Sequence, residues 1–131
     1  MTDDLAGFML ARIAEDEEVA RGAAGVPWET MRWPGGSQVL VAASAIRNEK
    51  WRLGKLGHVA TVEHTHDVDH IARHDPARVL AECDAKRRIV EQYIDAVKGR
   101  KWATCTALER VLPVLALPYA DHPDYREEWR P

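Results

Sequence analysis

A long amphipathic helix, predicted from Pro76 to about Gly99, constrains the fold of this chain more than any other feature of its sequence. Apolar residues recur there every three or four positions, so they share one face of the helix over about six turns. The preceding Asp75 marks the start, because aspartate caps free backbone N–H groups and proline needs no N–H group in the first turn. Either other parts of the chain or a second copy of it must cover this face. It consists of Val79, Leu80, Cys83, Val90, Tyr93, Ile94 and Val97.

Three more segments have helical patterns. The first covers about residues 3–22, where apolar residues lie near helical spacing. The second covers about residues 67–74, directly before the long helix. The third covers about residues 102–117, and we expect Pro113 to end or kink it. Proline has this effect because it lacks a backbone N–H group and clashes with the preceding turn.

Three short segments between the first two helices have strand character. They are residues 28–33, 37–42 and 58–63, and the Pro-Gly-Gly turn signal at residues 34–36 separates the first two. Their connections are too short for the helical crossovers that parallel strands need, so we expect an antiparallel arrangement. The predicted class is α+β, with an N-terminal helix, a small three-stranded antiparallel meander, a long central helix, a short C-terminal helix and an ordered tail.

The C-terminal tail, residues 118–131, combines prolines and charges with three aromatic residues. Disordered tails are poor in aromatic residues, because they have nothing to bury them against. We therefore expect an ordered tail, with Tyr119 and Trp129 beside the central helix. His122 is then expected to be a hydrogen-bonded structural histidine.

The length of 131 residues predicts a single domain over residues 1–131. The first residues lack the basic region of a secretory signal, and no apolar run is long enough for a membrane span. We therefore expect a cytoplasmic protein. In that compartment the two cysteines, Cys83 and Cys105, are expected to be buried thiols rather than a disulfide.

A cluster of histidines is the strongest chemical signal in the sequence. Four of the six histidines lie within residues 64–74, and His66, His70 and His74 are spaced four apart. A continuous helix would place these three imidazoles on one stripe, where Asp69 could add an oxygen ligand for zinc. The alternative is a polar helix start with half-exposed histidines and no metal.

Charge is segregated along the chain, although the net charge is only −3 and the pI is about 6.1. Residues 86–110 carry seven basic and three acidic residues, whereas residues 1–24 carry six acidic and two basic residues. The basic run Lys86, Arg87 and Arg88 has three interpretations. It pairs with acids of the same chain, it binds an acidic protein, or it binds nucleic acid.

Tryptophan is unusually common, with five residues against one phenylalanine. Three of them lie in the strand region close to arginines, a combination that is typical of protein interfaces and of single-strand stacking platforms. With the basic run, they form the predicted binding surface. It consists of Trp28, Trp33, Trp51, Arg32, Arg47, Arg52, Lys86, Arg87 and Arg88.

Two long motifs carry a resemblance to a known family. The first is His-Ile-Ala-Arg-His-Asp-Pro-Ala-Arg-Val-Leu at residues 70–80, followed by Ala-Lys-Arg-Arg-Ile-Val at residues 85–90. The second is Leu-Ala-Leu-Pro-Tyr-Ala-Asp-His-Pro-Asp-Tyr-Arg-Glu-Glu-Trp-Arg-Pro at residues 115–131. Together they resemble a family of small uncharacterised proteins of actinobacteria and their phages. The resemblance implies no particular reaction.

The sequence therefore favours a non-enzymatic accessory protein that binds a protein partner, and less strongly nucleic acid, with no cofactor. The alternative is a zinc-binding protein, or a metal-dependent hydrolase, that uses the histidine cluster. We also expect a homodimer through the central helix, because its apolar face is longer than a small sheet can cover.

Overall fold

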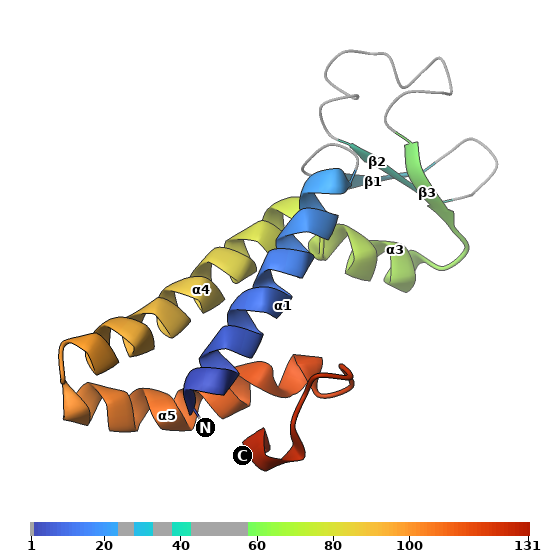
Figure 1. The fold of residues 1–131 in the computed structure, drawn as a ribbon. Helices are drawn as coiled ribbons and strands as arrows, with labels where there is room; N and C mark the ends of the chain where they lie inside the picture. Colours follow the sequence, from blue (N-terminus) through green and yellow to red (C-terminus); the bar gives the residue numbers. More distant parts are fainter. Residues whose placement is uncertain (1, 24–27, 33–37, 43–57) are drawn as a thin grey trace. The chain divides into compact units, whose positions relative to one another are not determined.

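The computed structural model describes residues 2–23, 28–32, 38–42 and 58–131 (Figure 1). These residues are mainly helical with a small β component, in agreement with an α+β class. No helix among them is long and apolar enough to cross a membrane. In chain order the elements are α1 (Thr2–Gly22), β1 (Trp28–Arg32), β2 (Gln38–Ala42), β3 (His58–Val62), α3 (Thr65–Arg73), α4 (Pro76–Lys98), α5 (Trp102–Ala116) and the 3-10 turns η2 (Leu117–Tyr119) and η3 (Glu127–Trp129).

The chain groups into two compact units. Unit 1 consists of Met1–Glu17 and Glu82–Pro131, and unit 2 consists of Glu18–Ala81. Helices α1 and α4 contribute to both units, because each unit boundary falls inside a helix. The single domain over residues 1–131 stays a prediction, to be tested by the cooperativity of unfolding.

Unit 2 contains the strands and α3. The strands pair antiparallel in the order β1-β2-β3, with Trp28 opposite Ala42 and Gln38 opposite Val62. Helix α3 lies against this sheet and contributes Val68, which is fully buried. The amphipathic pattern of α3 therefore covers one face of the sheet.

Asp75 joins the start of α4 to the first strand within unit 2. Its Oδ1 accepts a hydrogen bond from the backbone N–H of Arg78 at 2.9 Å, which is the predicted capping role. Its Oδ2 accepts a second hydrogen bond from the backbone N–H of Trp28 at 3.1 Å. The carboxylate is buried and has both oxygens bonded, so one residue fixes the helix start and positions β1.

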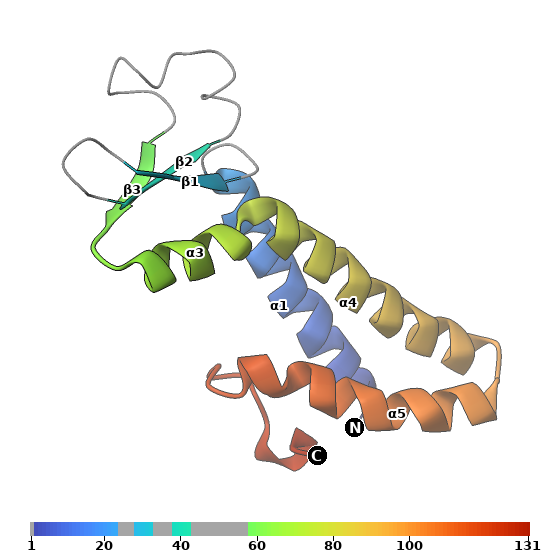
Figure 2. The same cartoon turned by 180° about the vertical axis from the view of Figure 1, so that it is seen from behind.

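The core of unit 1 lies between α1, α4 and α5, which Figure 2 shows from behind. Of the predicted apolar face of α4, Cys83, Val90 and Tyr93 are buried, whereas the other four residues of that face are only half-buried. Both cysteines are buried thiols, as expected. The buried side chains of unit 1 include Leu5, Met9 and Ile13 from α1, Cys83, Val90, Tyr93 and Ala96 from α4, and Cys105, Leu112 and Ala116 from α5.

Helix α5 does not end at Pro113, so of the two predicted effects of this residue, an end or a kink, only the kink remains a prediction. The helix continues to Ala116 and passes directly into η2. The missing N–H group costs one backbone hydrogen bond, but Leu112 and Ala116 on either side of Pro113 are completely buried. Burial of these two side chains offsets the local cost, because tertiary packing commonly overrides helix propensity.

The C-terminal tail folds back on unit 1 as an ordered segment, and its aromatic rings gather around Phe8 of α1. The centroid of the Phe8 ring lies 6.5 Å from that of Tyr119, 6.0 Å from that of Tyr125 and 5.0 Å from that of Trp129. Tyr119 also contacts Lys86 of the central helix, as predicted. Trp129 packs on α1 instead, because the ring of Phe8 offers it an apolar partner.

Trp129 and Trp102 provide a matched test of this packing, since they are 5% and 64% exposed. Trp129→Ala should lower the free energy of unfolding by about 3–5 kcal/mol, because it leaves a cavity beside Phe8. Trp102→Ala should change it by less than about 1 kcal/mol. Urea unfolding of the full chain measures both values. Equal stability of the two variants would show that the tail is not packed on α1.

Candidate functional site

Arg12 is the centre of a polar network between α1 and the tail. Its guanidinium contacts the ring of His122, with Nη1 2.7 Å from Nδ1, and Nη2 donates to Glu15 Oε1 at 2.8 Å. Asp124 Oδ2 lies 3.6 Å from Nη1. Arginine only donates hydrogen bonds, so the ring nitrogen that faces it acts as the acceptor. His122 is therefore the predicted hydrogen-bonded histidine, and the network holds the tail in place.

A second network lies beside the first and includes a residue of α4. The hydroxyl of Tyr119 donates to Asp16 Oδ2 at 2.6 Å, and Lys86 Nζ donates to the Tyr119 hydroxyl oxygen at 3.4 Å. Burial, followed by the hydrogen bond to Asp16, raises the pKa of Tyr119. Burial is also the main cause that raises the pKa of the Cys83 thiol, with Asp16 second. Cys83 is thus kept protonated, which makes it a packing residue rather than a nucleophile.

The basic run of α4, predicted as a binding surface, is engaged within the chain. Arg87 Nη2 lies 2.9 Å from Glu17 Oε2, and the two side chains are only 30% and 14% exposed. Arg88 Nε donates to Asp84 Oδ2 at 2.9 Å on the same helix. Lys86 donates to the Tyr119 hydroxyl oxygen, so all three basic side chains have partners inside unit 1. Internal pairing is therefore the interpretation that these contacts favour.

The other predicted binding residues lie in or near the strands. Trp28 is half-buried and lines a shallow depression of about 540 Å³ in unit 2, together with Glu29, Thr30, Asp69, Ala72 and Arg73. Arg32 is the last residue of β1. The remaining four predicted residues lie outside the described part of the chain. They are Trp33, Arg47, Trp51 and Arg52.

The histidine stripe differs from the predicted arrangement. His66 and His70 lie one turn apart on α3, but α3 ends at Arg73, because Asp75 and Pro76 start a new helix. The rings of His70 and His74 still approach to 4.4 Å between centroids, and the Nδ1–H of His74 donates to the backbone oxygen of His70 at 2.8 Å. Within the described ranges, no three His, Cys, Asp or Glu side chains are grouped to hold a metal ion.

Helix α5 presents an apolar surface that our sequence analysis did not identify. Val111, Val114 and Leu117 are 38%, 53% and 39% exposed, whereas Leu112 on the opposite side is completely buried. Spacings of three residues place Val111, Val114 and Leu117, the first residue of η2, on one side of this helical segment. Arg110 lies within the same stripe. We name this stripe the α5 outer face, and it consists of Ala103, Ala107, Arg110, Val111, Val114 and Leu117.

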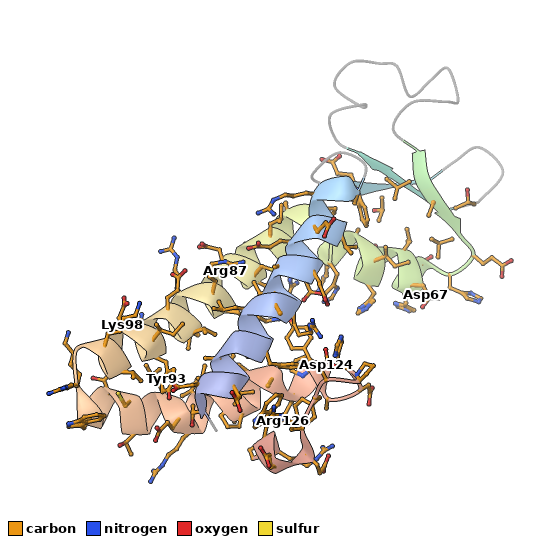
Figure 3. All side chains as sticks on the ribbon, in the orientation of Figure 1. Asp67, Arg87, Tyr93, Lys98, Asp124 and Arg126 are labelled. Atoms are coloured by element: carbon orange, nitrogen blue, oxygen red, sulfur yellow. The ribbon has the colours of Figure 1, made fainter. Side chains whose placement is uncertain are left out.

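The α5 outer face begins at a basic turn between α4 and α5, which we name the α4–α5 corner. The corner consists of Lys98, Arg100, Lys101 and Trp102, all of them exposed. Figure 3 shows Lys98 near the end of α4 and Arg87 further back along the same helix. In the part of the chain that the structure describes, the three cations of the corner form no ion pair. Trp102 is the most exposed aromatic residue there.

Arg100 has an unusual backbone conformation for its residue type, with φ of 53°. Its N–H donates to the Val97 oxygen at 3.1 Å, and the N–H of Lys101 donates to the Ala96 oxygen at 2.9 Å. These two bonds close α4 in a Schellman motif, in which the left-handed position normally carries glycine. Here the glycine, Gly99, comes one residue before the left-handed position, so Arg100 adopts the conformation that glycine adopts with less strain.

A family model matches residues 2–131, which is almost the entire chain; its description is a family of unknown function, DUF6221. The chain belongs to the DUF6221 family. No curated protein and no solved structure matches it. The structure is therefore the basis for assigning a function to this DUF6221 protein.

The histidine geometry leads to a prediction for the metal content of the DUF6221 protein. Untagged protein is expected to carry well below one transition metal ion per chain, because the histidines have no third and fourth ligand grouped with them among the described residues. Elemental analysis of the purified full chain measures this. One zinc per chain, lost together with thermal stability in the double variant His70→Ala and His74→Ala, would contradict it.

Tyr93 leads to a prediction for the pH dependence of stability. Burial, followed by the hydrogen bond that its hydroxyl donates to Asp3 Oδ1, raises the pKa of Tyr93 to about 12. A raised folded-state pKa stabilises the fold below the unfolded value of about 10, and this contribution is lost as the pH rises towards 12. Between pH 9 and pH 11 the free energy of unfolding of the native protein should decrease by about 1 kcal/mol more than that of the Tyr93→Phe variant. Urea unfolding at both pH values measures the difference, and parallel losses would contradict it.

Proposed function

We propose that this DUF6221 protein is a non-enzymatic protein-binding module, and that the α5 outer face docks a helix of its partner. The observation that carries the proposal is the exposure of Val111, Val114 and Leu117 on one side of a helix whose other side is the core. Contiguous apolar side chains on the surface of a small protein commonly mark an interaction site. An actinobacterial or phage origin, which the sequence motifs favour, and a cytoplasmic location both stay predictions.

The composition of the surface supports a protein partner. Large apolar residues together with tryptophan and arginine are typical of protein interfaces. The basic run of α4 does not offer a comparable surface, because Arg87 and Arg88 already contact acids of the same unit. The docking surface that we propose is therefore α5 rather than the basic flank of α4.

Trp102 and the stripe differ in the binding energy that they can contribute. Complete burial of a valine or leucine side chain stabilises by about 1.5–3 kcal/mol, so the roughly half-exposed residues of the stripe can each add about 1 kcal/mol. Trp102 is 64% exposed and offers more area than any of them. We expect Trp102 to be the residue whose truncation weakens binding most.

The proposal is tested by photo-crosslinking from position 114 of the full-length protein in cells that produce it naturally. A photoreactive phenylalanine at Val114 should capture one defined protein, whereas the same group at the exposed Glu91 of α4 should not. The captured protein must then be purified and must bind the native chain in a reconstituted assay. Capture alone would not suffice.

Val19 provides a matched control for the reconstituted assay, because it is an exposed valine on another helix, 76% exposed against 53% for Val114. Val114→Glu should weaken binding of the purified partner at least about tenfold, since it places a charge in the apolar contact. Val19→Glu should leave binding unchanged, and neither variant should lose more than about 0.5 kcal/mol of stability. If the partner binds Val114→Glu as tightly as the native chain, the proposed function is wrong.

A further inference from the structure

We infer that unit 2 binds an extended peptide, which adds as a fourth strand to the free edge of β1 and places a basic side chain against Glu29 and Asp69. In strand addition, main-chain hydrogen bonds supply the affinity and pockets for side chains supply the specificity. The residues involved all belong to unit 2. The inference therefore goes beyond the proposed function and does not depend on the α5 outer face.

The free edge belongs to β1. Among the described strands, β1 pairs only with β2, so its other side has no neighbouring strand. In an antiparallel pair, successive residues direct their backbone N–H and C=O groups alternately towards the partner strand and away from it. The N–H of Trp28 donates to Asp75 Oδ2 at 3.1 Å, so position 28 is directed away from β2. Thr30 and Arg32 are therefore directed away from β2 as well, whereas the residues between them bond to it.

Thr30 offers the hydrogen-bonding groups that an added strand needs. In the part of the chain that the structure describes, its backbone N–H and C=O have no backbone partner on the outer side of β1. Thr30 is exposed, so a peptide can reach these groups. A peptide residue directly opposite Thr30 would exchange two hydrogen bonds with it. Unpaired strand edges of this kind are templates for a further strand.

The shallow depression of about 540 Å³ lies along this free edge. It contacts three consecutive residues of β1, residues 28–30, although consecutive side chains point to opposite faces of a strand. All three are accessible together only from the edge of the strand, and β2 occupies the inner edge. The other wall consists of Asp69, Ala72 and Arg73, which share one stripe of α3. The depression is thus the place where a fourth strand would lie.

The charges of the depression favour a basic side chain on the peptide. Its lining carries two carboxylates and one guanidinium, from Glu29, Asp69 and Arg73, and therefore a net charge of −1. Across the described ranges, none of the three forms an ion pair, although Asp69 and Arg73 are one turn apart on α3. Trp28 adds an aromatic surface, which attracts lysine and arginine side chains. Complementary charge of this kind determines which partner is selected.

Other occupants fit this edge less well. A second copy of the chain, paired through its own β1, would bring two negatively charged depressions together, which like-charge repulsion disfavours. A nucleic acid would place its phosphates against Glu29 and Asp69. A small cation would satisfy the two carboxylates, but it would leave the backbone groups of Thr30 without a partner.

The test uses two synthetic six-residue peptides with blocked ends and the isotopically labelled full chain. The peptides share valine at alternate positions, and the other three positions are lysine in one and glutamate in the other. The lysine peptide should shift the backbone amide resonance of Thr30 and should bind at least about fivefold more tightly at low salt. High salt should reduce this ratio, because the charges are on the surface.

Amide hydrogen exchange tests the strand pairing directly. The N–H of Thr30 should exchange rapidly in the free protein and should become protected when the lysine peptide binds. The N–H of Glu29, which is directed towards β2, should be protected in both states. Protection of Thr30 requires a hydrogen bond at the outer edge, which contacts between charged side chains alone do not provide.

Backbone variants separate strand addition from side-chain contact. Thr30→Pro removes the outward N–H but keeps the ladder to β2, since proline is tolerated on the free side of an edge strand. It should weaken binding of the lysine peptide at least about tenfold, whereas Thr30→Ser should leave binding unchanged. Methylation of alternate backbone nitrogens of the peptide should have the same effect on the unaltered protein. This second measurement decides the question even if Thr30→Pro disrupts β1.

Charge variants of α3 test the choice of side chain. Asp69→Lys should weaken binding of the lysine peptide several-fold, and Arg73→Glu should strengthen it several-fold, because the two changes shift the charge of the depression in opposite directions. Asp67→Lys is the matched control, since Asp67 is exposed on α3 but does not line the depression. At physiological salt it should change the affinity by less than about twofold.

The results that would overturn the inference are distinct from those that concern α5. If the lysine peptide binds without protecting the Thr30 amide, or if the methylated peptide binds as tightly, strand addition is wrong. If the glutamate peptide binds as tightly as the lysine peptide, the basic side chain is wrong. Absence of any shift of Thr30 at millimolar peptide would overturn both parts. Protection of Thr30 that rises with protein concentration alone would assign the edge to a second copy. None of these results changes the outcome for Val114→Glu, which tests the proposed function.

Discussion

Packing of the C-terminal tail on Phe8 is the interaction on which the rest of unit 1 depends. The ring is buried and lies within 6.5 Å of the centroids of Tyr119, His122, Tyr125 and Trp129. Arg12 lies 5.2 Å above the same ring and also contacts His122, so the polar and apolar contacts of the tail converge on one turn of α1. Aromatic contacts of this kind stabilise beyond the area they bury, which explains how a segment rich in proline and charge stays on the helices.

The internal charge pairs determine which charges are left for a partner. Glu17 pairs with Arg87, and Asp16 accepts a hydrogen bond from the Tyr119 hydroxyl, so both of these acids of α1 have partners within unit 1. The bases of α4 that contact these groups are Arg87, which pairs with Glu17, and Lys86, which donates to the Tyr119 hydroxyl oxygen. Among the described residues, Lys98, Arg100 and Lys101 at the α4–α5 corner form no ion pair, unlike Arg87 and Arg88 on the flank of α4.

Parts of the structure that depend on local sequence could be predicted. The start of α4 follows from Asp75 and Pro76, and its buried face follows from the spacing of residues such as Val90 and Tyr93. The helical pattern predicted a helix over about residues 102–117, but whether Pro113 ends it could not be predicted, because that depends on the burial of Leu112 by distant residues. Similarly, the run of three bases on α4 does not reveal that Glu17, seventy residues away, contacts Arg87.

The α5 outer face was missed for a related reason. Residues 102–117 are apolar on both sides of the helix, and their sequence does not show which side is the core. One signal was available, because a helix at the surface of a small protein normally carries polar residues on its outer side. Replacing Val111 and Val114 by polar residues would change the free energy of unfolding of the monomer little, since both positions are exposed. The packing of unit 1 therefore does not require apolar residues at these two positions, and this is the observation on which the proposed function rests.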